Sequence, residues 1–320
     1  MLKGILSQPQ QTNGRQRPDD PHPGSVYERI VNSRDVRAVY ESSDVQLVPA
    51  TDDKPFFNQH TRWSRIRWNT LVDLFSQAKP MGARLALEDE PIAEVTLLIL
   101  LLQAVVIAGL CILAPLAAFS RRVLAAPGRW AWLGYLAALG LGFIMIEIAL
   151  LQRFLLFLGE PIYTYAVVLA GLLVFTGAGS LAAGKFAAEP GRALRRLLPV
   201  ALVVTLATAL VTAPVFRLFL GASLAARILI ALLLVAPLGF VLGMPVPLGL
   251  RLAMQQSLAL GSWAWGVNGF FTVIGTVLAV MLGMMIGFCM VIVLACAAYL
   301  GALVVIALLP RAASEAEDVA

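Results

Sequence analysis

Long apolar runs separated by short polar connections dominate the chain from residue 92 onward. Each run has the roughly 20 residues that an α-helix needs to cross the hydrocarbon core of a bilayer. The pattern predicts about seven transmembrane helices, at residues 93–119, 130–151 or 130–158, 162–183, 198–219, 225–246, 262–283 and 287–309. The last two runs adjoin so closely that residues 283–287 are expected to form a tight hairpin. The expected fold is an all-α polytopic membrane protein.

The N-terminal part of the chain lacks such runs and is expected to lie outside the membrane. Residues 1–24 are polar and rich in Pro, Gly and Gln, which is typical of a disordered tail. Residues 25–91 are expected to form a soluble or interfacial segment, and residues 92–310 the helical bundle. Residues 311–320 are predicted to be a polar C-terminal tail.

Three local signals fall in residues 25–91. Ser25 and Glu28 have the spacing of a capping box, which predicts the start of a short helix. Residues 44–48 alternate between apolar and polar side chains like a strand. Residues 61–76 gather apolar side chains on one face, as an interfacial amphipathic helix would, although one arginine interrupts that face.

Composition agrees with a membrane protein. Of all residues, 59% are hydrophobic and 13% are charged, whereas soluble domains have about 45–50% apolar and 25% charged residues. The net charge of +5 comes from the membrane part, because residues 1–91 hold 12 basic and 12 acidic residues. Its basic residues lie in short connections, where the positive-inside bias places them. This pattern does not indicate a nucleic-acid partner.

The basic residues also predict an orientation in the cell (inner) membrane. One side carries nine of them, at Arg121, Arg122, Arg129, Lys185, Arg192, Arg195, Arg196, Arg251 and Arg311. The other side carries three, at Arg153, Arg217 and Arg227. Lys79 and Arg84 precede the first span on that side and reduce the difference between the two counts. Loops 120–129 and 184–197 are therefore expected in the cytoplasm and the N-terminal tail outside.

Tryptophans occur where two predicted spans begin. Trp130 and Trp132 open the second span, and Trp263 and Trp265 open the sixth. Aromatic belts lie at this depth of a bilayer, so these residues are expected at the membrane–water interface.

No motif indicates a metal, a cofactor or a catalytic group. Cys111, Cys289 and Cys296 all lie in apolar runs, without CxxC or Cys/His metal-binding spacing. Nucleophilic triads, HExxH, P-loops and GxGxxG fingerprints are also absent from the sequence. We therefore expect no cofactor and no metal site.

Glu147 is the only acidic residue well inside a predicted span. A charge at mid-bilayer costs about 2.5–3.5 kcal/mol on insertion scales, so such a residue is retained for a partner, a proton or a substrate. Two interpretations remain open. The carboxyl group can stabilise the bundle as a protonated or paired group, with Arg153, Arg227 or Arg251 as candidate partners, or it can handle an ion or a substrate.

Two further segments in the membrane part are candidates. Pro245 and Pro247 have glycines beside them and are expected to break or kink a helix. Such a break can line a binding cavity, or it can simply be a helix end at the interface. Asn268 lies between glycines, where it can hydrogen-bond across helices or contribute to a binding site.

The soluble segment contributes two adjacent carboxylates, Asp52 and Asp53. Their surroundings, from Thr51 to Pro55, predict a turn with an extended exit. The same carboxylates could attract a polyamine or a metal ion. The residues leave both interpretations open.

Four segments in order carry a resemblance to a known family. They are PATDDKPFF at 49–57, GLGFIMIEIALLQRFLLFLGEPIYTYAVVL at 140–169, LGMPVPLGLR at 242–251 and WAWGVNGFFTVIGTVLAV at 263–280. Together they resemble the C-terminal portion of large membrane-bound spermidine-synthase-like proteins, over about residues 40–309. In that family a Rossmann-like aminopropyltransferase-type domain precedes the membrane helices, and a TDD-x-PFF element links the two.

The chain departs from this family in one respect. It has no Gly-rich loop for the nucleoside cosubstrate and no set of acidic residues to hold the polyamine. The resemblance therefore implies the membrane half alone, from a truncated gene or one half of a split pair, without synthase activity of its own. An outward tail conflicts with a cytosolic cosubstrate, so either the predicted orientation or that implication is wrong.

Three functional hypotheses follow. The first is a non-catalytic membrane module that anchors or serves a soluble synthase-like partner encoded nearby and binds a cationic amine such as a polyamine. The second is a small-solute or polyamine transporter that uses Glu147 and the break at Pro245 and Pro247. The third is a membrane enzyme with Asp52, Asp53 and Glu147 as its carboxylates.

Overall fold

The computed structural model describes residues 33, 35, 38, 39, 50–56, 92–119, 123 and 128–308. The chain divides into two compact units, Met1–Val48 and Pro49–Ala320. In the first unit, the backbone N–H of Ala38 donates to Asp35 Oδ1 at 3.3 Å. The predicted tail at 1–24, the capping-box helix, the strand at 44–48, the amphipathic helix at 61–76 and the tail at 311–320 lie outside the described residues.

The second unit is helical and confirms the predicted fold class. Seven of its helical segments are long and apolar enough to cross a membrane. In chain order its elements are α5 (Ile92–Ala108), η3 (Gly109–Leu113), α6 (Ala114–Phe119), α7 (Arg129–Leu158), α8 (Pro161–Ala183), η5 (Gly184–Phe186), α9 (Pro190–Phe219), α10 (Leu224–Leu242), α11 (Pro245–Gln256), α12 (Leu258–Ile286) and α13 (Phe288–Leu308). The protein is thus an all-α polytopic membrane protein.

Two spans depart in detail from the uniform helices that the hydropathy predicts. In the first, η3 is a five-residue π-helix that ends just before Pro115. Proline clashes with the carbonyl four residues earlier in a regular helix, and a π-turn relieves that conflict. In the fourth, α9 begins at Pro190 instead of residue 198. Much of the predicted loop 184–197 is therefore helix, because Ala193, Leu194 and Leu198 give it a buried face.

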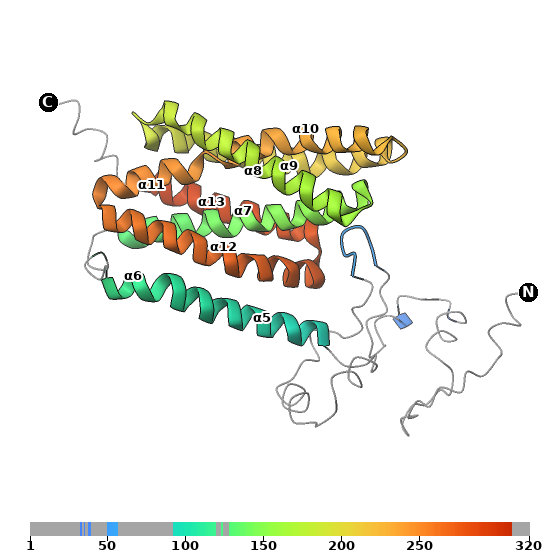
Figure 1. Ribbon diagram of the computed structural model, residues 1–320, viewed down its shortest axis with the longest axis horizontal. Helices are drawn as coiled ribbons and strands as arrows, with labels where there is room; N and C mark the ends of the chain where they lie inside the picture. Colours follow the sequence, from blue (N-terminus) through green and yellow to red (C-terminus); the bar gives the residue numbers. More distant parts are fainter. Residues whose placement is uncertain are drawn as a thin grey trace, which may run out of the picture. The chain divides into compact units, whose positions relative to one another are not determined.

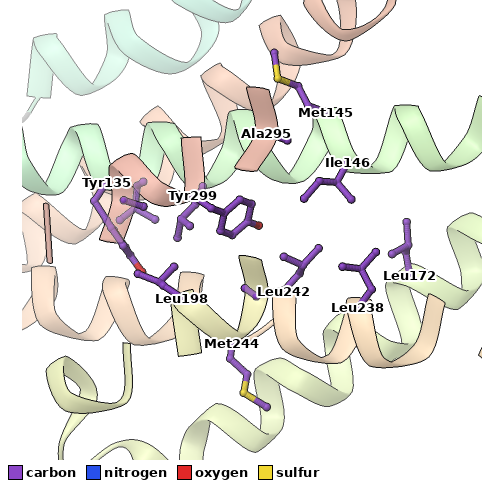
Figure 2. Packing of buried hydrophobic residues seen from close by; sticks show 14 of the residues in the cluster. Tyr135, Met145, Ile146, Leu172, Leu198, Leu238, Leu242, Met244, Ala295 and Tyr299 are labelled. Atoms are coloured by element: carbon purple, nitrogen blue, oxygen red, sulfur yellow. The ribbon is translucent and has the colours of Figure 1, made fainter. Parts of the chain in front are cut away.

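Helix α7 forms the centre of the bundle (Figure 1). In its most apolar stretch of 18 residues, 61% of the stretch is buried inside the bundle. The corresponding share is 6% for the first span, which lies at the edge and packs mainly on α12. Figure 2 shows the side chains that converge around α7 from α8, α9, α10 and α13. They include Leu172, Leu198, Leu238, Leu242, Ala295 and Tyr299, which surround Tyr135, Met145 and Ile146 of α7. The other helices are therefore organised around one long transmembrane helix.

The tryptophans at the helix starts divide into two kinds. Trp130 and Trp265 are 67% and 63% exposed, as side chains of an aromatic belt should be. Trp132 and Trp263 are only 4% and 7% exposed and belong to the core. These two therefore face the bundle and not the lipid, because positions two residues apart on a helix face nearly opposite directions.

Candidate functional site

Residues 50–56 form a compact turn beside the bundle (Figure 1). The N–H of Lys54 donates to the Thr51 carbonyl at 2.9 Å and to Thr51 Oγ1 at 3.1 Å. The N–H of Thr51 returns a bond to the Lys54 carbonyl at 3.2 Å. These bonds confirm the predicted turn and place Asp52 and Asp53 at its tip.

The tip of this turn contacts the start of α13. The carbonyl of Asp53 accepts the N–H of Phe288 at 3.0 Å, and its Oδ1 accepts the N–H of Cys289 at 2.6 Å. Gly287, whose carbonyl accepts the N–H of Val291 at 3.2 Å, occupies the N-cap position. A glycine has no side chain to bond the free N–H groups of a first helical turn. Asp53 therefore serves as the N-cap side chain of α13 from a distant part of the chain.

Lys54 bonds the C-terminal end of α12, the helix that ends beside this turn. Its ammonium group donates to the carbonyl of Met285, in the last turn of α12, at 2.9 Å. A negative group at a helix N-terminus and a positive group at a C-terminus both oppose the helix dipole. One Asp–Lys dipeptide thus stabilises both helix ends of the predicted hairpin.

Gly287 makes this double contact possible. It is the single residue between α12 and α13, with φ of 93°, a conformation that side chains with a Cβ rarely adopt. A Cβ built on it would collide with the carboxylate of Asp53. The glycine therefore serves both the sharp reversal and the close approach of the turn.

An aromatic contact completes the docking. The rings of Phe56 and Phe288 lie 5.8 Å apart, and Phe56 packs against the core. Asp52, by contrast, is exposed. The adjacent carboxylates therefore have separate roles, with Asp53 bound to α13 and Asp52 open to solvent.

Arg153 connects the docked turn to other helices. Its Nη1 donates to the carbonyl of Ala209 at 2.9 Å and to Thr212 Oγ1 at 3.4 Å, both on α9. Its Nη2 lies 2.9 Å from the Sγ of Cys289, whose N–H bonds Asp53. A polar network thus runs from the turn through α13 and α7 to α9, and none of these bonds involves Glu147.

The other two arginines proposed as partners of Glu147 behave differently. Arg227, in the first turn of α10, donates from Nη1 to the carbonyl of Phe157 at 2.8 Å, near the end of α7. Arg251 is exposed on α11. Among the residues that the structure describes, the salt bridge formed is that between Arg192 and Glu189.

Glu147 is half-buried on α7. Its side chain forms no hydrogen bond or ion pair with any residue in the described part of the chain. Gly140 and Ile144, seven and three residues earlier, lie on the same side of the helix as Glu147. They pack against Asn268 and Gly275 of α12, so Glu147 lies on the side of α7 that faces α12.

The proline segment does break a helix, as predicted. α10 ends at Leu242, and α11 begins with Pro245 in its first position, so Gly243 and Met244 form the break. The backbone of Thr176 lies so close to Gly243 that a Cβ there would collide with it, and the hydroxyl of Tyr135 donates to the Pro245 carbonyl at 2.9 Å. The break is therefore filled by protein groups, which favours a structural role.

Asn268 forms the predicted bond across helices. Its Nδ2 donates to the carbonyl of Leu136 on α7 at 2.9 Å. Gly140 leaves the space for it, since a Cβ at Gly140 would lie 2.5 Å from the Asn268 carbonyl oxygen. Asn268 therefore helps to join α7 to α12.

Local sequence reasoning identified Glu147, Asn268 and the turn, but not the residues that the turn contacts. Met285, Gly287 and Cys289 lie more than 230 positions from Asp53 and Lys54. The one local signal was the tight hairpin itself, because a reversal at a glycine leaves a helix start without a capping side chain. Within the described ranges, no group of three or more His, Cys, Asp or Glu residues could hold a metal ion.

Comparison of the chain with protein-family models, with curated proteins and with solved structures gives no match in any of the three.

Proposed function

We propose that this chain is the non-catalytic membrane module of a spermidine-synthase-like system, which anchors a soluble synthase-like partner at the membrane. One observation carries the proposal. The turn at residues 50–56, which precedes the bundle in the chain, is bonded to the α12–α13 hairpin through Asp53 and Lys54. A flexible tether needs no contact with the bundle. A module that holds a soluble domain at a defined position needs such a contact in the segment that links the two.

The geometry agrees with the family resemblance of the sequence. The resemblance makes the TDD-x-PFF element the link between a catalytic domain and the membrane helices. Here that element contacts the bundle through a backbone carbonyl, a carboxylate, an ammonium group and an aromatic ring. A link with four kinds of contact would hold a preceding or associated domain at a defined position.

The turn at residues 50–56 offers a cationic amine one exposed carboxylate. Asp53 is engaged with α13, whereas Asp52 is exposed. Spermidine titration of the purified protein tests this part of the proposal. We expect weak binding that is lost in Asp52→Asn, and equal binding by Asp52→Asn and the unaltered chain would remove Asp52 as the site.

The anchoring function is tested by reconstitution. The purified chain is placed in liposomes, and a soluble aminopropyltransferase-type protein encoded beside it is added. We expect the soluble protein to float with the liposomes and to do so less when Asp53→Ala is used. We also expect no product from the membrane chain alone with a nucleoside sulfonium donor and a polyamine. Turnover by the chain alone, or no flotation with liposomes that hold it, would contradict the proposal.

A second candidate function is transport of a small solute, and Glu147 favours it. An ionisable residue in a membrane helix marks ion and substrate pathways in many transporters, and this one has no partner among the described residues. Uptake of labelled polyamine or cations into liposomes tests this candidate. Uptake that Glu147→Gln abolishes would favour transport over anchoring, and uptake equal to empty liposomes would exclude it for those solutes.

The orientation is part of the proposal. At the end of the bundle that holds Arg192, Arg195, Arg196 and Lys185, Glu189 is the one described carboxylate, and it pairs with Arg192. We propose that this end faces the cytoplasm of the cell (inner) membrane, which places the turn at residues 50–56 and any partner held there on the opposite, outer side. Reporter fusions after Arg129 and Arg196 test it, and activity of a periplasm-only reporter at both positions would reverse the orientation.

A further inference from the structure

We infer that Glu147 is a proton-binding site of the α7–α12 interface, a carboxyl group that is neutral at rest and can take up and release one proton. The inference deepens the second candidate function, because it names the ion that this residue would handle. It is independent of the anchoring function.

Glu147 lies far from both ends of α7. Glu147 lies about 27 Å along α7 from Arg129 and about 17 Å from Leu158, at 1.5 Å per residue. Both distances exceed the reach of a glutamate side chain, so its carboxyl group cannot extend to water at either helix end. A carboxylate at this depth is either paired with a cation or protonated.

The described helix on the side that faces Glu147 carries no cation. α7 packs against α8, α9, α10, α11, α12 and α13. The helix that faces Glu147, α12, has no titratable residue in its entire length, and α13 has no Lys, Arg or His. Besides Glu147, the titratable and charged groups of α7 and these neighbours are Arg129, Tyr135, Arg153, Tyr163, Tyr165, Arg192, Arg195, Arg196, Arg217, Arg227, Arg251, Cys289, Cys296 and Tyr299, and none of them is bonded to Glu147.

Two of these arginines are engaged with other groups of the bundle. Arg153 bonds a carbonyl, a hydroxyl and a thiol on α9 and α13, and Arg227 bonds the carbonyl of Phe157. Arg129 opens α7 and lies over the ring of Trp130, and Arg251 is exposed on α11. None is bonded to Glu147, so protonation is the remaining way to remove its charge.

A stripe of polar side chains runs along α12. Asn268, Thr272 and Thr276 are spaced four residues apart and so share one helix face. Asn268 bonds the α7 carbonyl of Leu136, which shows that this face is turned toward α7. The Thr272 and Thr276 hydroxyls donate to the carbonyls of Asn268 and Thr272 at 2.9 and 3.0 Å. Their oxygen lone pairs remain available to accept a bond from a donor such as a protonated carboxyl group.

The chemical step is simple. The carboxylate of Glu147 accepts one proton from a hydronium ion that enters the bundle from the aqueous phase, forms one O–H bond and becomes neutral, and a water molecule is left. The reverse step breaks that O–H bond, returns the proton to water and restores the negative charge. No other reactant is needed.

Carbodiimide labelling tests the inference. Dicyclohexylcarbodiimide enters the bilayer and adds to a protonated carboxyl group, which then rearranges to a stable N-acylurea. The protein in liposomes is treated with this reagent and the labelled peptides are identified by mass spectrometry. We expect label on Glu147, lost in Glu147→Gln, and slower labelling as the pH is raised. Glu160 lies exposed in the connection between α7 and α8. It is the matched carboxylate control and should remain unlabelled.

Two outcomes would overturn the inference. One is an unlabelled Glu147 in protein that is intact by circular dichroism. The other is an infrared carbonyl band of a protonated carboxyl group that is the same in Glu147→Gln and in the unaltered chain. Label on Glu147 without uptake of any solute would support the proton site and contradict the transport function. Loss of label would leave the anchoring function untouched.

Discussion

The α12–α13 turn and the middle of α7 hold polar side chains in opposite circumstances. At the turn, Asp53 and Lys54 bond free groups at two helix ends. In the middle of α7, Glu147 has no bond to a described residue. The polar groups of the turn complete the backbone hydrogen bonding of two helices. The carboxyl group of Glu147 forms no bond that joins the described helices of the bundle.

This difference separates architecture from chemistry. A polar group that satisfies a helix end stabilises the fold, and its loss leaves buried donors or acceptors without partners. A polar group without partners in a membrane helix lowers the stability of the fold, and a chain retains it for another use. Substitutions at the two places should therefore have very different effects on the free energy of unfolding.

The largest loss is expected for Gly287→Ala. The backbone conformation at this position is strained for alanine, and the added Cβ would displace the Asp53 carboxylate. Together these effects should lower the free energy of unfolding by about 3 kcal/mol. Unfolding in detergent measures it. Gly301→Ala, in the open part of α13, is the control and should be neutral or slightly stabilising.

Asp53→Ala should have the next largest effect. It leaves the Cys289 N–H without its acceptor and should cost about 1–2 kcal/mol, as the loss of an N-cap does. Asp52→Ala changes an exposed side chain and should leave the unfolding midpoint unchanged. Equal effects at the two positions would contradict the division between the carboxylates.

Lys54→Met should have a smaller effect. The change removes one bond to the Met285 carbonyl and the favourable interaction with the C-terminal end of α12. A loss of about 0.5 kcal/mol is expected, because helix-dipole interactions at exposed ends have this size. Lys54→Arg, which keeps the charge, should lose less, and the difference should shrink as salt is added.

Glu147→Gln should have the smallest effect on stability. Breaking a buried ion pair costs about 3–5 kcal/mol, but no described residue pairs with Glu147. We expect the unfolding midpoint to stay within error of the unaltered chain. A loss as large as that of a broken ion pair would show that a cation binds this carboxylate and would remove the contrast between the two places.

Features that depend on the chain nearby could be predicted from the sequence. The seven spans follow from runs of apolar residues, and the turn at Thr51 follows from local side-chain chemistry. The bond from Asn268 to α7 was one of two open interpretations. Each of these signals lies within about one element of the structure that it predicts.

Features that depend on distant partners could not be predicted. Hydropathy gives the depth of a residue but not its direction, so it could not show that Trp132 and Trp263 are buried in the core. Arg153 bonds a carbonyl, a hydroxyl and a thiol. No sequence pattern distinguishes these three acceptors from the other carbonyl, hydroxyl and thiol groups of the chain. Asp53 could be recognised as a capping residue, but the helix that it caps is more than 230 positions away.

Hydrogen exchange at the start of α13 tests the central claim most directly, that the turn at residues 50–56 caps this helix. The amides of Phe288 and Cys289 are compared in the unaltered chain, in Asp53→Ala and in Asp52→Ala, all in lipid nanodiscs. The account predicts faster exchange of the Cys289 amide in Asp53→Ala, a smaller change at Phe288, whose acceptor is the backbone carbonyl of residue 53, and unchanged exchange in Asp52→Ala. Identical exchange in all three proteins would contradict it.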